Sequence, residues 1–496
     1  MRLDLNLLAT APVLAPVLAA VLVLVLDAIW PRQRTLHLGV AAAGLALGAA
    51  AALPGLRLGT GDRSAAFCLS SGACSYVVDR LTASLQVAGL LAALVVLVLA
   101  WRDWAAPTDS GRTPVVVALL LGATAGVVAV PAAGDLGTLL VSLELATLPT
   151  IGLVALTHPR WTEQRRAGAI EGSVALLTTS LVSFALLAMG AALWVAATGT
   201  ALLPTGTLQV DHPPLLVLAA VFAVAGLAFK VSAVPFHAWT PITYAHAPLP
   251  VTGYLATVSK VAALGALVVL VRALGRVDDT TLLAIALLAA LSMTIGNLVA
   301  LTQRDTVRLL AWSTVAQAGW VLLPLATLSA RAVHAAGSYL LVYVAGTLLA
   351  FVVVIVLAGA DRAPAALSRS SSLESHRGLI RSRPLLALPL SFALLTLAGL
   401  PPAVVGLVAK VVALRPVVGD GMWWLAIVAA VNVALGIAVY VRWIAVLMGR
   451  PGDVPPEREQ RGGDHRPEHP SVAAWVLVGG LTLLLVLASI VPVGII

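Results

Sequence analysis

Residues 229–237 of the chain read FKVSAVPFH, and they end an apolar segment that begins near residue 214. A membrane-spanning helix needs about 20 predominantly apolar residues, but Lys230 and Pro235 interrupt this segment. Proline removes a backbone donor and clashes with the preceding helical turn. Inside a bilayer, backbone groups freed in this way are tolerated only where protein or a water-filled cavity satisfies them. The stretch therefore predicts a helix that breaks within a membrane, beside a buried cation.

A second break of the same kind lies in the other half of the chain, at Pro401 and Pro402. Pro235 lies 121 residues after position 114, where an apolar segment starts, and Pro401 lies 121 residues after position 280, where another starts. Interrupted helices at corresponding positions of two halves are typical of inverted-repeat transporters. Because each half holds five spans, an odd number, the second copy is expected to be inserted upside down relative to the first.

The composition places the rest of the chain in the membrane as well. Of 496 residues, 60% are hydrophobic and 10% are charged, whereas a soluble domain averages about 25% charged residues. This excludes a soluble enzyme, a disordered protein and a nucleic-acid-binding module. The expected fold class is an all-α polytopic membrane protein with about 14 transmembrane helices. Their expected ranges are 7–29, 36–54, 79–100, 114–132, 135–156, 168–198, 214–236, 249–272, 280–301, 307–328, 333–358, 385–414, 421–448 and 471–493.

The predicted spans leave no stretch long enough for a soluble domain. The arginines in the loops between them indicate how the chain is oriented in the membrane. Loops after odd-numbered spans hold 18 arginines and the opposite loops hold 8, so the positive-inside rule puts both termini on the outer side. This asymmetry also accounts for the net charge of +8 without a nucleic-acid partner. The expected parts of the chain are 1–113 with helices 1–3, 114–272 with the first repeat (helices 4–8), 280–448 with the second, inverted repeat (helices 9–13), and 449–496 with a cytoplasmic loop and the last helix.

The chain has two cysteines, Cys68 and Cys74, and this topology puts both in an outer loop. A disulfide is permitted on that side of the membrane. Two free thiols in a short loop fit the sequence equally well, and neither state carries the main function.

Only 3 of the 30 basic residues are lysines, and all three lie within predicted spans, as Glu144 does. A charge at the bilayer centre costs about 2.5–3.5 kcal/mol on insertion scales, so Glu144, Lys230, Lys260 and Lys410 must be paired, hydrated or neutral. Arginine stays protonated in proteins, whereas a buried lysine can release its proton near neutral pH. Lysine is thus the cation expected along a proton path. Alternatively, these lysines are fixed structural cations paired with acids.

Two further ionisable residues are candidates: His237 for the proton relay, and Glu171 as a secondary candidate. His237 would share a face with Lys230 if the helix continued past the proline, and it is either a relay group or a satisfied polar side chain. Glu171, near the start of the sixth span, can pair with Arg165 or Arg166. The sequence contains no phosphate-cradling glycine motif, no Cys/His metal spacing and no haem-type histidine pair. The chain is therefore expected to bind no metal, nucleotide or redox centre.

Several motifs surround these candidates. They are residues 229–241 (FKVSAVPFHAWTP), 247–252 (APLPVT), 256–260 (ATVSK), 296–301 (GNLVAL), 308–313 (RLLAWS) and 398–402 (AGLPP), with Gly406 and Lys410. Together they resemble the subunit N family of antiporter-like membrane subunits in bacterial NADH–quinone oxidoreductase (complex I). The resemblance covers essentially the whole chain, and the Val-Pro-Phe-His and Ser-Lys elements favour subunit N over its sister subunits.

The resemblance implies a role for each candidate. Glu144 matches the fifth-helix glutamate that pairs with a seventh-helix lysine, and Lys230 matches that lysine. Lys260 matches the central relay lysine of the eighth helix, and Lys410 matches the twelfth-helix lysine of a second half-channel. His237 matches a histidine placed between the first two lysines. The resemblance therefore implies a proton relay along these five residues.

Three positions depart from the family pattern. Ile242 replaces the aspartate that usually follows Trp-Thr-Pro, Ala175 replaces a lysine four residues after Glu171, and Gln317 replaces a tenth-helix histidine. These departures put a relay role for the three positions in doubt, whereas the set of one glutamate and three lysines is intact.

The expected function is proton translocation by a membrane subunit of NADH–quinone oxidoreductase in the bacterial cell membrane. Redox chemistry in other subunits, with NADH, FMN, iron–sulfur clusters and quinone, would drive it. The expected partners are a neighbouring antiporter-like subunit, small membrane subunits and the lipid bilayer, and the enzyme is the whole assembly. Two alternatives remain open: a subunit of a multisubunit sodium/proton antiporter, and a structural scaffold subunit that no longer pumps.

Overall fold

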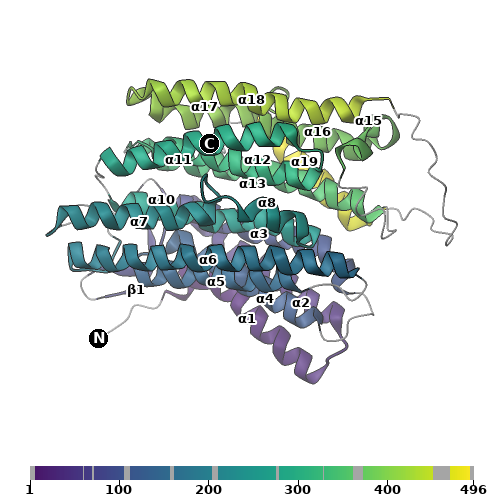
Figure 1. The fold of residues 1–496 in the computed structure, drawn as a ribbon. Coiled ribbons are helices and arrows are strands. Elements are labelled where there is room, and N and C mark those ends of the chain that lie inside the picture. The colour runs from purple at the N-terminus through teal and green to yellow at the C-terminus, as the bar shows by residue number, and fades with distance from the viewer. Residues whose placement is uncertain are drawn as a thin grey trace.

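The computed structural model shows a bundle of long helices that run side by side (Figure 1). Twelve helices among the described residues are long and apolar enough to cross a membrane, and a bent pair of helices would make thirteen. The all-helical membrane fold expected from the sequence is thus confirmed. The structure describes residues 6–59, 61–69, 72–105, 112–156, 161–203, 210–274, 279–327, 329–360, 372–450 and 470–491.

The sequence predicts 14 spans, and a helix or a pair of helices covers each of them. Two predicted spans are not among the twelve continuous ones. Residues 307–328 contain α12, in which Arg308 and Gln317 lower the hydropathy, and residues 385–414 are divided between α16 and α17. The elements are α1 (Leu7–Ile29), α2 (Arg34–Ala52), η1 (Leu53–Arg57), β1 (Ser64–Cys68), β2 (Cys74–Val78), α3 (Arg80–Trp104), α4 (Arg112–Ala129), η2 (Val130–Ala132), α5 (Leu136–Ala155), α6 (Glu163–Thr198), α7 (Pro213–Val231), α8 (Trp239–His246), α9 (Leu249–Ala256), α10 (Val258–Leu274), α11 (Asp279–Thr302), α12 (Thr306–Leu325), α13 (Ala330–Ala360), η3 (Leu373–His376), α15 (Leu379–Ser382), α16 (Pro384–Ala398), α17 (Val404–Gly419), α18 (Trp423–Met448) and α19 (Val472–Ile490).

Aspartates begin three of the helices. Asp79, Asp135 and Asp305 each accept a hydrogen bond, at 2.8 Å, from the backbone N–H three residues later. Such a cap satisfies one of the N–H groups that a helix leaves unpaired at its start, and it is worth about 1 kcal/mol. The starts of α3, α5 and α12 are therefore set by the local sequence.

A small β-hairpin between η1 and α3 is an addition to the all-helical prediction. β1 pairs antiparallel with β2, and a disulfide joins Cys68 to Cys74. Of the two cysteine states that the sequence left open, the structure therefore has the disulfide. The backbone N–H of Gly134, after η2, donates to the carbonyl of Ser75 at 2.8 Å, which ties the hairpin to the start of α5.

Two helices end inside the bundle. α7 ends at Val231 because Ser232 adopts a left-handed conformation, with a φ of 70°, and the helix stops five residues before the predicted end at residue 236. α16 ends at Ala398 in the same way, and Gly399 has a φ of 76°. A left-handed residue ends a helix and the prolines that follow prevent its continuation. Both breaks expected from the sequence are present.

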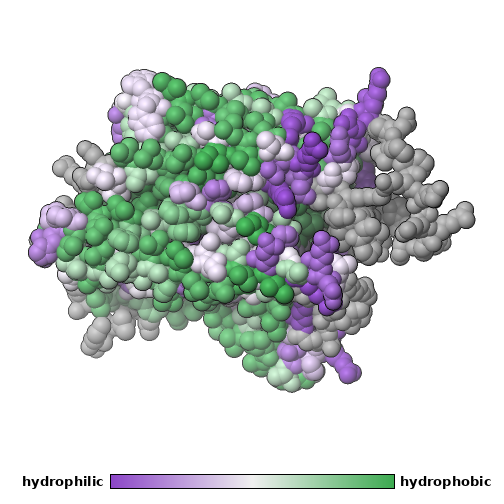
Figure 2. All heavy atoms as spheres, in the orientation of Figure 1, coloured by the Kyte–Doolittle hydropathy of each residue, from purple (hydrophilic) through white to green (hydrophobic). Residues whose placement is uncertain are grey.

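The helices form an inner and an outer group. The spans at α9–α10 and at α13 are 94% and 83% buried, whereas the spans of α1 and α19 are 28% and 22% buried. In Figure 2 apolar side chains cover most of the visible face along the helices, and hydrophilic side chains gather towards the right-hand edge. An apolar outer face of this kind suits contact with lipid, which agrees with a multi-pass membrane protein.

Candidate functional site

A buried ion pair joins α5 to α7. Lys230 Nζ lies 2.8 Å from Glu144 Oε1, and the exposed side-chain fractions are 7% for the lysine and 17% for the glutamate. The amine also donates to Thr147 Oγ1 at 3.0 Å and to Ser180 Oγ at 3.4 Å. The two residues expected to pair therefore lie in contact, and neighbouring hydroxyl groups occupy the remaining donors of the amine.

The amine of Lys260 is held by the end of the broken helix α7. Its Nζ atom donates to Ser232 Oγ at 2.5 Å and to the carbonyl oxygens of Lys230 and Val231, each at 3.3 Å. The ring of Trp239 lies below it, with 5.0 Å between Nζ and the ring centre. The lysine is 1% exposed. Because the carbonyl of Lys230 binds Lys260, the two lysines are neighbours across the break.

The amine of Lys410 has an equivalent position at the second break. Its Nζ atom donates to the carbonyl oxygen of Ala398, the last residue of α16, at 2.6 Å. It also lies 5.1 Å from the centre of the Trp320 ring. A Cβ atom on Gly399 would approach Lys410 Cδ to 3.0 Å, so the glycine leaves room for the lysine chain. The second break thus forms a tight site for one amine.

Lys260 and Lys410 share an arrangement that Lys230 lacks. Each amine meets the carbonyl end of a helix, where the last carbonyl groups lack N–H partners and the helix dipole favours a cation. Within the described residues, neither amine has a carboxylate partner. The interpretation of these two lysines as fixed structural cations requires carboxylate partners, and the described residues provide none.

Arg442 on α18 offers a comparison within the same molecule. Its guanidinium lies at the carbonyl end of α11, where it donates to the carbonyl groups of Leu301 and of Gln303. Arginine keeps its charge at this position, which suits a permanent helix cap. At the two broken helices the same task falls to lysine, the cation that can lose its charge.

Hydroxyl groups extend from the first break towards the second. The hydroxyl of Tyr343 on α13 donates to the carbonyl of Ala256, at the end of α9, at 2.6 Å. The hydroxyl oxygen also lies 3.3 Å from Thr314 Oγ1 on α12. Ala256 precedes Lys260 by four residues in the chain.

An amide and two further tyrosines continue this polar chain to the second break. Gln317 Nε2 donates to the hydroxyl of Tyr440 at 2.8 Å and to the carbonyl of Leu397 at 3.2 Å. The hydroxyl of Tyr339 donates to Gln317 Oε1. Leu397 precedes the residue whose carbonyl binds Lys410. Gln317, a departure from the family pattern, thus lies at the centre of a hydrogen-bonded cluster.

In the part of the chain that the structure describes, neither His237 nor Glu171 is a hydrogen-bond or ion-pair partner of the three lysines. Because α7 ends at Val231, the seven-residue spacing does not put His237 on the face of Lys230, and its ring packs 5.0 Å from that of Trp312. Glu171 is exposed on α6, and it forms no ion pair among the described residues. The guanidinium of Arg165 instead lies 4.2 Å over the ring of Trp161.

A small cavity adjoins Lys230. Its volume is about 20 Å³, and Ser180 of α6 and Ser259 of α10 line it together with the lysine. A polar cavity of at least about 10–15 Å³ can hold one water molecule, and Ser259 directly precedes Lys260. In the described part of the chain, no three His, Cys, Asp or Glu side chains lie close enough together to hold a metal ion.

Helices that break beside a line of buried lysines define a class of membrane subunit, the antiporter-like subunits. The model of the family described as "NADH:quinone oxidoreductase/Mrp antiporter, TM" matches residues 133–436. NADH-quinone oxidoreductase subunit N 2 of Streptomyces griseus is 40% identical over 468 residues, which cover 91% of this chain and 84% of the relative. Subunit N of Salinispora tropica is 42% identical over 455 residues, covering 87% and 83%. The chain belongs to the subunit N family of NADH–quinone oxidoreductase.

Solved structures agree with this assignment. A chain in the structure of respiratory complex I from Thermus thermophilus with bound aureothin has a TM-score of 0.76 and 29% identity, with 97% of each chain covered. A chain in the structure of the Mrp complex from a Dietzia species has a TM-score of 0.77 and 21% identity, with 98% and 95% covered, and it shares the fold. Family membership makes the chain a multi-pass membrane subunit of bacterial complex I.

Proposed function

We propose that this chain translocates protons through a relay of Glu144, Lys230, His237, Lys260 and Lys410, driven by redox chemistry in other subunits of the complex. The observation that carries the proposal is the burial of two lysines at the carbonyl ends of broken helices, where no described residue offers them a carboxylate partner. An amine in such a place can bind and release a proton, whereas a guanidinium cannot.

In the proposed path a proton enters from the cytoplasm through the first repeat and reaches Lys230. Glu144 stabilises the protonated lysine, and separation of the pair removes that stabilisation, so that the proton moves on. One water in the cavity beside Lys230, together with His237, would connect this amine to Lys260. The proton leaves the chain near Lys410, on the other side of the membrane.

The polar chain between the breaks supports the second half of this path. Tyr343 and Tyr440 offer hydroxyl groups that can accept and donate a hydrogen bond at once. Gln317 offers no titratable proton, so its proposed task is to hold Tyr339 and Tyr440 in place. This arrangement gives the position a role that differs from that of the histidine usual in the family.

The proposal includes the organisation of the chain and its surroundings. Residues 114–272 and 280–448 would be the two inverted repeats, and each contains one broken helix. Both termini would lie on the outer side, as the distribution of arginines indicates. A neighbouring antiporter-like subunit and small membrane subunits would adjoin the chain, while NADH, FMN, iron–sulfur clusters and quinone would act in other subunits.

Replacement of Lys260 tests the proposal in the assembled complex. Lys260→Ala should reduce NADH-driven proton pumping into vesicles by roughly 100-fold, the scale of losing a positioned proton-transfer group. Lys260→Arg should support assembly yet fail to pump, because the guanidinium does not release its proton. Arg442→Lys, which keeps a cation at a helix end away from the relay, is the matched control and should pump normally.

The outcome also separates the alternatives. Unchanged pumping by an assembled Lys260→Ala complex would refute the relay. Sodium-dependent transport without NADH oxidation would favour an antiporter subunit. Full assembly and pumping after removal of all three lysines would leave only a scaffold role. The amount of complex on a native gel and the rate of NADH oxidation are measured alongside pumping.

A further inference from the structure

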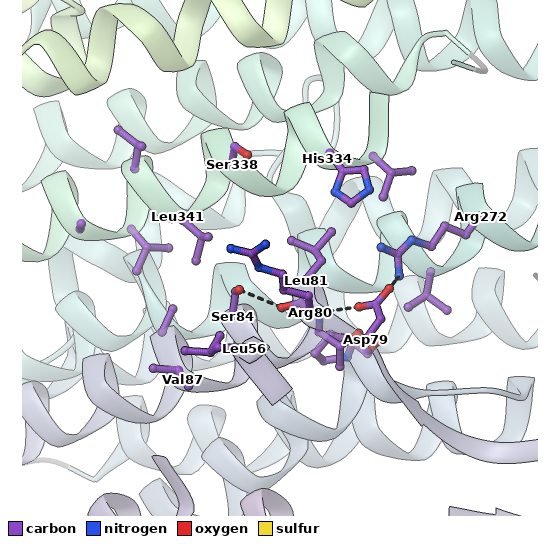
Figure 3. A pocket seen from close by; sticks show the side chains of 18 of the residues that line it. Leu56, Asp79, Arg80, Leu81, Ser84, Val87, Arg272, His334, Ser338 and Leu341 are labelled. Carbon is purple, nitrogen blue, oxygen red and sulfur yellow. Dashed lines mark hydrogen bonds and ion pairs between the residues drawn. The ribbon is translucent and has the colours of Figure 1, made fainter. Parts of the chain in front are cut away.

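A large groove lies between α3, α13 and α19, and none of the three buried lysines lines it (Figure 3). Its volume is about 1190 Å³, more than the roughly 300–1,000 Å³ that is usual for small-molecule sites. Most of its wall is apolar, with Leu91 on α3, Leu341 and Leu348 on α13, and Leu484 on α19. Leu91 and Leu484 are 47% and 51% exposed, so the groove opens onto the lipid-facing surface.

The mouth of the groove carries the charged groups. Arg272 Nη1 lies 2.8 Å from Asp79 Oδ2, so these two charges offset each other. Figure 3 shows Arg80 beside this pair, with His334 and Ser338 across the opening from it. Arg80 is exposed, and no carboxylate in the described residues forms an ion pair with it. Arg80 is therefore a cation at the end of an apolar groove for which the described part of the chain supplies no counter-ion.

The lining of the groove has the length of one leaflet of a bilayer, headgroup region included. On α3 the lining runs from Arg80 to Val95, which at 1.5 Å per residue is about 22 Å. On α13 it runs from Val333 to Leu348, also about 22 Å. A bilayer with its headgroup regions is about 40–45 Å thick, so half of it matches the depth of the groove.

We propose that the groove binds a membrane phospholipid, with an acyl chain between α3 and α13 and the phosphate on Arg80. The charges at the mouth fit one phosphodiester anion: three arginines and two aspartates line the groove, a net charge of +1, and the ion pair of Asp79 with Arg272 leaves Arg80 for the lipid. A guanidinium binds phosphate oxygens with two parallel hydrogen bonds. This site is independent of the proton relay, and neither proposal rests on the other.

Native mass spectrometry of the complex, purified in mild detergent and supplied with dioleoyl phosphatidylglycerol, tests the proposal. The wild-type chain should retain one tightly bound lipid, and Arg80→Gln should bind it roughly tenfold more weakly because a charged hydrogen-bonding partner is lost. Arg331→Gln is the matched control, since Arg331 is an exposed arginine at the start of α13 that does not line the groove. Ala88→Phe, which fills the groove without a change of charge, should also exclude the lipid.

Each result decides the matter. Loss of the lipid in Arg80→Gln and Ala88→Phe, with retention in the Arg331→Gln control, supports the site. Equal retention in wild type and both groove variants overturns it. A helix of a neighbouring subunit seated in the groove in a structure of the assembled complex overturns it as well.

Discussion

Removal of the negative charge from the Glu144–Lys230 pair should destabilise the protein by several kcal/mol. Glu144→Gln keeps the shape of the side chain and one oxygen acceptor, but it leaves the lysine charge without a partner. At the observed 2.8 Å and an effective dielectric constant of about 20, the attraction is about 6 kcal/mol. Desolvation offsets part of that figure, and loss of one partner from a buried pair costs about 3–5 kcal/mol. We expect the unfolding free energy to fall by about 3 kcal/mol or more.

Unfolding by SDS titration in mild detergent measures this effect in four proteins: wild type, Glu144→Gln, Lys230→Met and the double variant. The double variant removes both charges, so its loss of stability should be smaller than the sum of the single losses by about 2–3 kcal/mol. Asp420→Asn, at an exposed position after α17, is the control and should change stability by less than about 0.5 kcal/mol. A double variant whose loss equals that sum would refute the reasoning, because the two charges would then not be coupled.

Three further predictions concern other parts of the molecule. Tyr440→Phe removes a hydroxyl with two buried partners, so the same titration should show a loss of about 1–3 kcal/mol; unchanged stability and pumping would contradict a role for the polar chain. Gly406→Ala would place a methyl group against the backbone carbonyl of Thr396, so a native gel should show little assembled complex, and normal assembly would contradict this close approach. Burial raises the pKa of Asp79, but Arg272 and hydrogen bonds at the start of α3 outweigh burial and hold the pKa below its usual 3.8. The stabilisation by Asp79 is therefore complete above that usual value and is lost as the pH falls through the lowered pKa. Acid should thus narrow the difference in unfolding midpoint between wild type and Asp79→Asn, and a difference that stays constant down to about pH 2 would count against the ion pair.

The sequence predicts the helices well because an apolar run of about 20 residues is stable chiefly as a membrane-spanning helix. It does not predict where a helix ends inside the membrane, since that depends on the conformation of one residue. Ser232 ends α7 five residues before the predicted boundary. His237 consequently packs against Trp312 instead of sharing a face with Lys230. The hairpin of β1 and β2 was not predicted from the sequence, because each strand has only five residues.

The lysines of the site are visible in the sequence, but the polar chain between them is not. A lysine inside an apolar run stands out because a charge within the membrane is costly, whereas a tyrosine or a glutamine carries no charge. The partners are also distant along the chain: Gln317 and Tyr440 are separated by 123 residues. Six tyrosines occur in the whole sequence, and Tyr339, Tyr343 and Tyr440 all meet this cluster. Their scarcity in the chain is a signal that could have indicated these three residues.

In the proposed relay, the carbonyl groups that hold Lys260 and Lys410 would limit how many protons the interior of the chain carries at once. Glu144 cancels the charge of Lys230, and carbonyl dipoles have no net charge with which to cancel another cation. A proton on Lys260 or Lys410 therefore adds a full positive charge to the middle of the protein. A second proton would be opposed by the first through like-charge repulsion. We expect the proposed relay to carry one proton at a time, so that one proton leaves before the next one enters.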